Sequence, residues 1–309
     1  MKEKTEILFY YESEQNPNGD PGFENQPRLM PDDTIMVTDV RIKRTIRDYA
    51  RNVHGQTLFV DYDKNGQPTK ADSKAQEILG KLSGDILGGL LEKTFDVPLF
   101  GALVPIRKTK GVEGSSEKLT GPLQFGISRS VNKVKIINPT ISGRFVGAEK
   151  EGKQFSTFGK FYSVEYALIK VQGAINPDNL GKYLENKEIV KKFQEKVSMI
   201  HDCLWNGTTQ LITRSKYPQR SILYIEVIYN AKIYNDLPLL VDESSKMKDY
   251  AKKLGASTFD FTKMIEILGK RKSEIQKVRI RGADDITKDV DELISKLKSK
   301  GITVEKISD

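Results

Sequence analysis

The stretch Val37-Thr-Asp-Val-Arg-Ile-Lys-Arg-Thr-Ile-Arg-Asp-Tyr49 decides how the first part of this chain folds. Its apolar residues recur at helical spacing beyond the end of the stretch, at Ile42, Ile46, Tyr49, Ala50 and Val53. This spacing predicts a helix over residues 38–53 with one buried stripe. Thr38 is a suitable N-cap, and Asp39 suits the positive end of the helix dipole.

Basic residues form an arc beside that apolar stripe. At about 100° per residue, the clustered side chains are Lys43, Arg44, Arg47 and Arg51. Arg41 lies outside the arc, and the acid Asp48 lies on a different side of the helix. Most basic helix faces are simply solvated, but few acids are interleaved here at i,i+4 spacing. We therefore favour contact with RNA phosphates over a solvated face.

A turn-forming loop, Asn16-Pro-Asn-Gly-Asp-Pro21, precedes this helix and is followed by Pro27-Arg28. Its Asn-Pro, Asn-Gly and Asp-Pro dipeptides each favour turns. The apolar, aromatic run at residues 7–11 predicts a buried strand before the loop. The connection over residues 12–37 is long for a plain strand-to-helix link, which favours a functional loop. Such a loop can present backbone N–H groups and Asn side chains to a ligand.

Composition limits the class of protein. The 309 residues suffice for one large domain or for a core with large insertions. The formal net charge of +8 and the sequence pI of about 9.2 favour an anionic partner. The single cysteine, Cys203, excludes a disulfide framework and suits a reducing cytoplasm. We find neither a membrane-spanning apolar stretch nor a signal peptide, so we expect a soluble, cytoplasmic protein.

The remaining patterns complete a strand-helix-strand-strand-helix-strand order. The second helix is predicted over residues 187–204, ended by Asn206-Gly207. The predicted strands cover residues 5–12, 121–128, 162–171 and 221–229. This order is typical of the ferredoxin-like fold and therefore predicts an α+β protein. Further helices are expected around residues 259–271 and 286–299.

Two segments interrupt this core. Residues 55–98 predict an inserted, partly helical lobe. Residues 129–160 contain short alternating segments around a polar, glycine-bearing middle, which predicts a projecting hairpin. The core itself is assigned to residues 1–54 and 99–230, and residues 231–309 form a C-terminal extension.

Motifs of common enzyme classes are absent. The chain has no Walker A motif, no G-x-G-x-x-G fingerprint and no H-E-x-x-H motif. With one cysteine beside His54 and His201, we expect no zinc site and assign both histidines to packing. An RNA-cleaving enzyme stays open as an alternative, with Asp20 assisting a metal ion or, less readily, His54 as general base. We favour a turn role for Asp20, and predict no catalytic residue, resident metal or cofactor.

Several short blocks, spread from the first strand to about residue 230, together match a known family. They are Asn16-Pro-Asn-Gly-Asp-Pro21, Pro27-Arg28, Thr38-Asp-Val-Arg-Ile-Lys-Arg-Thr-Ile-Arg47, Phe100-Gly101, Thr120-Gly-Pro-Leu-Gln-Phe125, Tyr166-Ala-Leu-Ile169, Leu204-Trp-Asn-Gly-Thr-Thr-Gln210 and Thr213-Arg-Ser-Lys216. On these blocks the chain resembles the CRISPR-associated backbone subunits of type I Cascade complexes, within the RAMP superfamily. Among them it is most similar to the Csh-type protein of subtype I-B. Residues 55–98 and the tail after 230 carry no matching motif.

The resemblance implies an RRM-like palm, a finger lobe at residues 55–98 and a hairpin thumb at residues 129–160. It implies a non-catalytic subunit that binds crRNA, forms a helical filament with further copies and other Cascade subunits, and supports target DNA recognition through the guide. The implied guide-binding residues are Asn18, Arg28, Lys43, Arg44 and Arg47, followed by Arg214 and Lys216. Related type III subunits cut target RNA with a loop aspartate, which is the alternative for Asp20. We find no RNP motif, as expected for a guide bound regardless of sequence.

Overall fold

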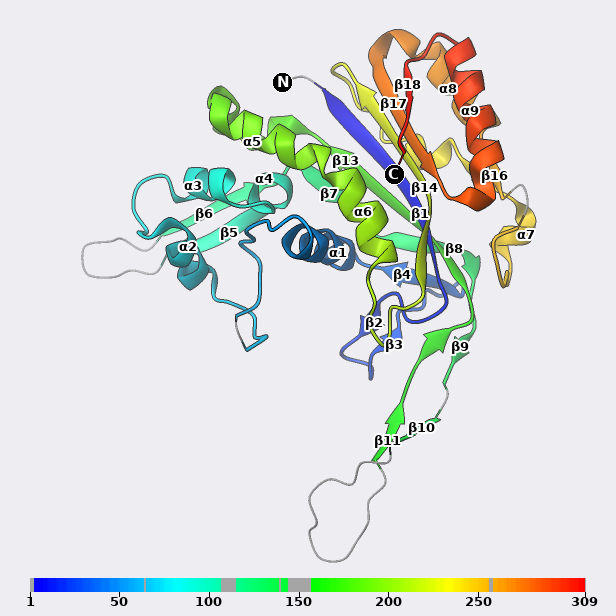
Figure 1. Cartoon of the computed structure of the whole chain (residues 1–309), viewed down its shortest axis with the longest axis horizontal. Helices are drawn as coiled ribbons and strands as arrows, with labels where there is room; N and C mark the ends of the chain where they lie inside the picture. The colour runs from blue at the N-terminus through cyan, green and yellow to red at the C-terminus, as the bar shows by residue number, and fades with distance from the viewer. Residues whose placement is uncertain are drawn as a thin grey trace, which may run out of the picture.

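The first strand, β1 (Lys4–Ser13), lies inside the main sheet of the computed structural model, as Figure 1 shows. The structure describes residues 3–63, 65–106, 115–138, 140–143, 157–255 and 258–308. The other strands of this sheet are β4 (Thr34–Val37), β7 (Leu123–Phe125), β8 (Ser128–Lys133), β13 (Ala167–Ile175), β14 (Gln219–Tyr229), β17 (Ile275–Gly282) and β18 (Val304–Lys306). Their order is β18-β17-β14-β1-β13-β8-β4, with β7 also paired to β13. β17 and β18 run parallel, and the other pairs run antiparallel.

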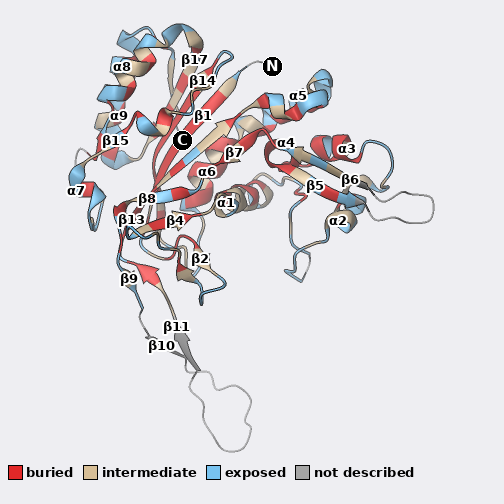
Figure 2. Ribbon diagram, turned by 180° about the vertical axis from the view of Figure 1, so that it is seen from behind, coloured by how far each residue is buried: buried red, intermediate tan, exposed pale blue. Residues whose placement is uncertain are grey.

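Helices pack on both faces of the main sheet. Those on one face are α1 (Asp39–Asn52), α5 (Lys187–Ser198) and α6 (Ile200–Thr209), and those on the other are α8 (Thr262–Lys270) and α9 (Thr287–Ser299). Alternate residues of β1 face the two sides. Ile7 and Phe9 therefore enter the core under α1 and α6, whereas Leu8 and Tyr10 enter the core under α8 and α9. Buried positions run along the central strands in Figure 2. The predicted α+β class is confirmed.

The predicted element order is present as β1, α1, β7, β13, α5 with α6, and β14, and β7 is shorter than the strand predicted over residues 121–128. The second predicted helix, however, breaks at Met199 and continues to Thr209. Gly207 therefore does not end it. A Cβ atom at Gly207 would lie 3.0 Å from Cβ of Tyr49, so this glycine lets α6 approach α1 closely.

The lobe lies to one side of the sheet in Figure 1 and extends beyond the predicted residues 55–98. It contains α2 (Ala71–Leu79), α3 (Ile86–Lys93), α4 (Val97–Phe100) and a hairpin of β5 (Gly101–Ile106) with β6 (Ser115–Thr120). The main chain approaches itself closely at the base of this hairpin, just before β5 and just after β6. A Cβ atom at Gly121 would lie 2.1 Å from the carbonyl carbon of Phe100, which explains why a glycine stands there.

A two-legged projection leaves the sheet and points away from the body of the molecule in Figure 1. One chain segment carries β9 (Ile136–Ile137) and β10 (Thr140–Gly143), and the returning segment carries β11 (Thr157–Lys160) and β12 (Ser163–Val164). β9 pairs with β12, and β10 pairs with β11. The predicted hairpin middle, residues 147–152, lies outside the described residues. The projection starts later than the predicted residue 129, because β8 belongs to the main sheet.

Polar side chains of β8 explain that difference, because they bind main-chain groups instead of water. Ser130 Oγ accepts a hydrogen bond from the Ile35 N–H at 2.8 Å. The Asn132 amide donates to the Tyr166 carbonyl at 3.0 Å and accepts from the Leu168 N–H at 2.9 Å. Alternate residues of this polar strand are therefore buried in the sheet although its sequence resembles an exposed hairpin.

Short elements complete the described chain. They are β2 (Gly19–Asp20), β3 (Gln26–Pro27), β15 (Asp242–Glu243), β16 (Phe259–Asp260), α7 (Ser245–Lys248) and the 3-10 helices η1 (Pro177–Glu185), η2 (Leu237–Leu239), η3 (Lys272–Glu274) and η4 (Asp284–Ile286). None of the helices in the described ranges combines the length and apolar character that crossing a bilayer requires.

Candidate nucleic-acid interface

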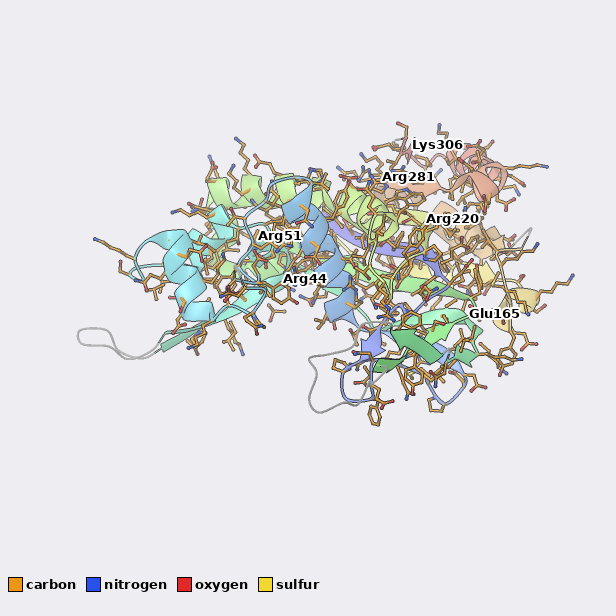
Figure 3. All side chains as sticks on the ribbon, turned by 60° about the horizontal axis from the view of Figure 1, so that its bottom comes forward. Arg44, Arg51, Glu165, Arg220, Arg281 and Lys306 are labelled. Atoms are coloured by element: carbon orange, nitrogen blue, oxygen red, sulfur yellow. The ribbon has the colours of Figure 1, made fainter. Side chains whose placement is uncertain are left out.

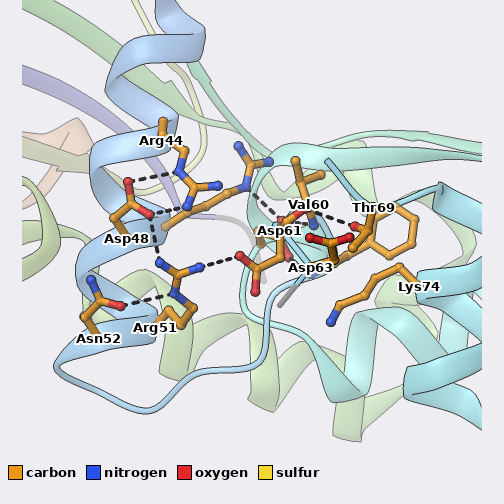
Figure 4. A network of polar contacts seen from close by, with 12 residues as sticks. Arg44, Asp48, Arg51, Asn52, Val60, Asp61, Asp63, Thr69 and Lys74 are labelled. Carbon is orange, nitrogen blue, oxygen red and sulfur yellow. Dashed lines mark hydrogen bonds and ion pairs between the residues drawn. The ribbon is translucent and has the colours of Figure 1, made fainter. Parts of the chain in front are cut away.

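The basic arc of α1 is not an open face. Figure 3 shows Arg44 and Arg51 on the side of α1 that faces the lobe. Arg44 forms a bidentate pair with Asp48, with Nε 2.9 Å from Oδ2. Arg51 contacts Asp48 at 3.4 Å and Asp61 of the lobe at 2.5 Å, and Figure 4 shows this network. The expectation of few acidic partners along the helix was wrong, because Asp48 pairs with Arg44 at i,i+4 spacing and with Arg51 at i,i+3 spacing.

Arg47 lies deepest of the arc and connects α1 to the lobe. It is 8% exposed, and its Nε lies 2.8 Å from Oδ2 of Asp96, which is 1% exposed. Asp96 also accepts two main-chain N–H groups of the lobe, at 2.8 and 3.0 Å. Lys43 donates to Asp39 at 3.0 Å. Through Arg47 and Arg51, the arc therefore holds α1 against the lobe, a role that the sequence does not reveal.

Other predicted residues meet at a cavity of about 500 Å³ beside the β2–β3 loop. Asn18, Arg214 and Lys216 line it together with Asn16 and Arg41. Arg41 was excluded from the predicted site because it lies off the arc. Its position in the first helical turn, directly after the loop, is the signal that could have identified it.

Three cations and one acid, Glu24, line this cavity. Among the described residues, none of its three cations, Arg41, Arg214 and Lys216, forms an ion pair with an acid. Burial, together with the nearby Arg41, lowers the pKa of Lys216 to about 8. Burial also lowers the pKa of Arg41. Both shifts indicate cations that are poorly compensated, and a bound anion would compensate them.

Aromatic and amide groups surround these cations. The Arg214 guanidinium lies 5.5 Å from the centre of the Phe161 ring, a cation–π contact. Lys216 Nζ donates to the main-chain carbonyl of Asn16 at 2.6 Å, joining two loops 200 residues apart. The cavity is therefore lined by cations, amides, two aromatic side chains, Phe161 and Tyr162, and the carboxylate of Glu24. Cations, amides and aromatic faces are groups that recognise a sugar-phosphate chain.

Asp20 and Arg28 are neighbours at the outer edge of the loop. Arg28 Nη2 lies 3.5 Å from Oδ1 of Asp20, and the same oxygen accepts the Gly22 N–H at 2.9 Å. Asp20 thus has the predicted turn role. Across the described ranges, no three His, Cys, Asp or Glu side chains gather in a way that could hold a metal ion.

The histidines occupy different surroundings. His54, which was assigned to packing, has an acidic partner, because its Nε2 lies 2.6 Å from Oδ2 of Asp202. This pair lies beyond the far end of α1 from Arg41, since the helix from Arg41 to its last residue, Asn52, spans about 16 Å at 1.5 Å per residue. His201 is buried, and burial followed by Arg281 and Arg279 lowers its pKa to about 4.

Comparison with known proteins gives a consistent result. The family described as CRISPR-associated protein Cas7 matches residues 3–265. The CRISPR-associated protein Cas7 of Haloferax volcanii is 26% identical over 338 residues, which cover 98% of this chain and 96% of the relative. A solved chain of a CRISPR RNA-guided surveillance complex, pre-nicking, has a TM-score of 0.52 at 11% identity and covers 99% of this chain and 96% of its own. That structural similarity bears on the fold alone.

Proposed function

This chain belongs to the CRISPR-associated Cas7 family, and we propose from that premise that it is the crRNA-binding backbone subunit of a type I CRISPR surveillance complex. The family match over residues 3–265 carries the proposal, because it spans most of the main sheet, α1, α5, α6 and the cationic cavity. The similarity to the Haloferax protein supports subtype I-B. In this proposal the subunit recognises target DNA only through its guide and has no catalytic role.

The parts of the fold take the roles that the family resemblance implies. The main sheet with α1, α5 and α6 is the RRM-like palm, and the lobe with α2, α3 and the β5–β6 hairpin is the finger. The projection that begins with β9 is the thumb. The extension over residues 231–309 adds β17 and β18 to one edge of the main sheet and covers the second face of the sheet with α8 and α9.

We place the guide at the cationic cavity. Arg41, Arg214 and Lys216 contact phosphates there, and Asn18 joins them from the loop. Arg28 lies in the same loop and stays a predicted contact. The residues of the α1 arc are already paired with acids, so we treat their contact with RNA as secondary. Phosphate contacts of this kind bind a guide whatever its sequence.

Charge removal tests this placement. In Arg41→Ala combined with Lys216→Ala, the log–log salt slope of binding to single-stranded RNA should shrink by about 1.4, from about 0.7 per phosphate contact. Arg51→Ala is the matched control, since Arg51 is a cation of the same helix that contacts acids instead of the cavity. An unchanged slope in the folded double variant would remove the cavity from the binding surface.

Assembly provides the test of the function itself. A projection that contacts the next copy head to tail makes a heterologous interface, which generates an open filament when the rotation does not close. Copy number should therefore grow with RNA length in native mass spectrometry, and the RNA that copurifies should be repeat-derived. Deletion of residues 145–156 should impair filaments more than folding. A fixed stoichiometry across RNA lengths, or a protein that copurifies without RNA, would contradict the proposed function.

A further inference from the structure

The segment that contains β2 and β3, residues 15–28, holds polar atoms without a hydrogen-bond partner in the described part of the chain. Eight buried side-chain nitrogen and oxygen atoms have no hydrogen-bond partner among the described residues, and four of them belong to residues 15–28. Two of these are Oδ1 of Asn16 and Nδ2 of Asn18, on side chains that line the cationic cavity. Asn16 is 4% exposed and Asn18 is 6% exposed. Unpaired groups this deeply buried are unfavourable unless a ligand completes them.

The orientation of the Asn16 amide is determined by its other hydrogen bond. Asn16 Nδ2 donates to the main-chain carbonyl of Asn25 at 2.5 Å. A carbonyl can only accept, so the nitrogen must point to Asn25 and the free atom must be the oxygen. Asn16, which lines the cavity together with Arg41 and Lys216, therefore carries an unpaired acceptor.

The backbone of the loop maintains this arrangement. Glu24 and Asn25 both have positive φ, 50° and 59°, which turns the chain so that the Asn25 carbonyl meets Asn16. A Cβ atom at Gly19 would lie 2.8 Å from that carbonyl oxygen and 3.1 Å from Nδ2 of Asn16. The glycine in the Asn-Gly dipeptide is needed here for close approach, and side chains at position 19 would disturb the amide.

An acceptor in a phosphate site requires a ligand that also carries a donor. Phosphodiester oxygens only accept, so they suit Arg41 and Lys216 but cannot satisfy Oδ1 of Asn16. Base edges carry donors, but their positions change with sequence. The 2′-hydroxyl is a donor present on every ribonucleotide and absent from DNA.

We infer that this cavity distinguishes RNA from DNA, with Asn16 accepting a hydrogen bond from the 2′-hydroxyl of a guide nucleotide whose phosphate lies against Arg41 and Lys216. The inference rests on the proposed function and adds a determinant of sugar specificity to it. Asn18 donates to the same sugar-phosphate unit through Nδ2. The cations and Asn16 therefore have different roles in this proposal. The cations attract either nucleic acid, and the Asn16 amide selects the ribose.

The affinities of the protein for matched oligonucleotides test these two roles. RNA, DNA of the same sequence and 2′-O-methyl RNA are compared on strands short enough for one copy of the protein. RNA should bind about 10-fold tighter than the other two, because each of them leaves the buried acceptor without a donor. Asn16→Ala should lose that preference, because it should weaken RNA binding more than DNA binding. Arg41→Ala, the control, should weaken RNA and DNA alike.

A measurement without protein variants covers the case in which Asn16→Ala does not fold. Single 2′-deoxy substitutions are moved along an RNA strand bound by one copy, and one position should cost about 10-fold in affinity. Equal affinity of the wild-type protein for RNA and DNA, no sensitive position in the scan, or a preference that persists in folded Asn16→Ala would overturn the inference. Equal binding of both nucleic acids would leave the proposed function standing, whereas failure to bind either would defeat that function instead.

Discussion

Arg47→Ala separates the structural role of α1 from the RNA contact that its sequence suggests. The Arg47 side chain is 10% exposed, and its partner Asp96 is 1% exposed. Truncation leaves the Asp96 carboxylate buried with two main-chain N–H donors and no positive charge. Breaking a buried ion pair from one side costs about 3–5 kcal/mol. The guanidinium also lies 4.8 Å from the centre of the Phe100 ring, and loss of that contact adds to the cost.

Urea unfolding monitors this change directly. The free energy of unfolding should fall by about 3–5 kcal/mol in Arg47→Ala and by about 1 kcal/mol or less in Arg51→Ala. Arg51 is a matched control on the same helix, with a side chain that is 35% exposed. Adding Asp96→Asn to Arg47→Ala should recover part of the loss, because the amide carries no unpaired charge.

RNA binding by the same variants completes the test. The salt slope of RNA binding should not change in Arg47→Ala under conditions where the variant is folded, because its guanidinium faces the lobe instead of the cavity. A variant as stable as the wild-type protein, with a slope smaller by about 0.7, would refute this reasoning and restore Arg47 as a phosphate contact.

Three further predictions follow from other parts of the molecule. Burial, followed by Arg281 and Arg279, lowers the pKa of His201 to about 4, so the unfolded chain takes up a proton first as the pH falls below about 6.5. The free energy of unfolding should therefore decrease from pH 6.5 towards 4, and His201→Phe, which keeps a ring beside Tyr224, should remove that part of the pH dependence. Gly121→Ala should destabilise the protein by about 1–3 kcal/mol in urea, because its Cβ atom would meet the backbone of Phe100, and unchanged stability would contradict that packing. Incubation with complementary RNA and Mg²⁺ should produce no cuts, and metal-dependent cuts that disappear in Asp20→Ala would favour the ribonuclease alternative.

Local patterns were sufficient for the long central helices and strands. The apolar spacing predicted a helix over residues 38–53, and α1 spans Asp39–Asn52 with Thr38 as its cap. Helical and strand periodicity depends on neighbours a few residues apart, which is why a sequence reveals it. The same reasoning failed at Gly207, because glycine ends many helices but here allows two distant helices to touch.

The sequence by itself determined the α+β class, the order of the central elements, the basic character and, through its motif blocks, the family resemblance. Only the tertiary structure decided which cations are paired with acids and which are left to bind an anion. Arg47 is neutralised by Asp96, 49 residues away, whereas Lys216 reaches Asn16 from 200 residues away and shares a cavity with Arg41. Charge and burial depend on neighbours in space, and chain folding brings those neighbours together over separations that no sequence period records.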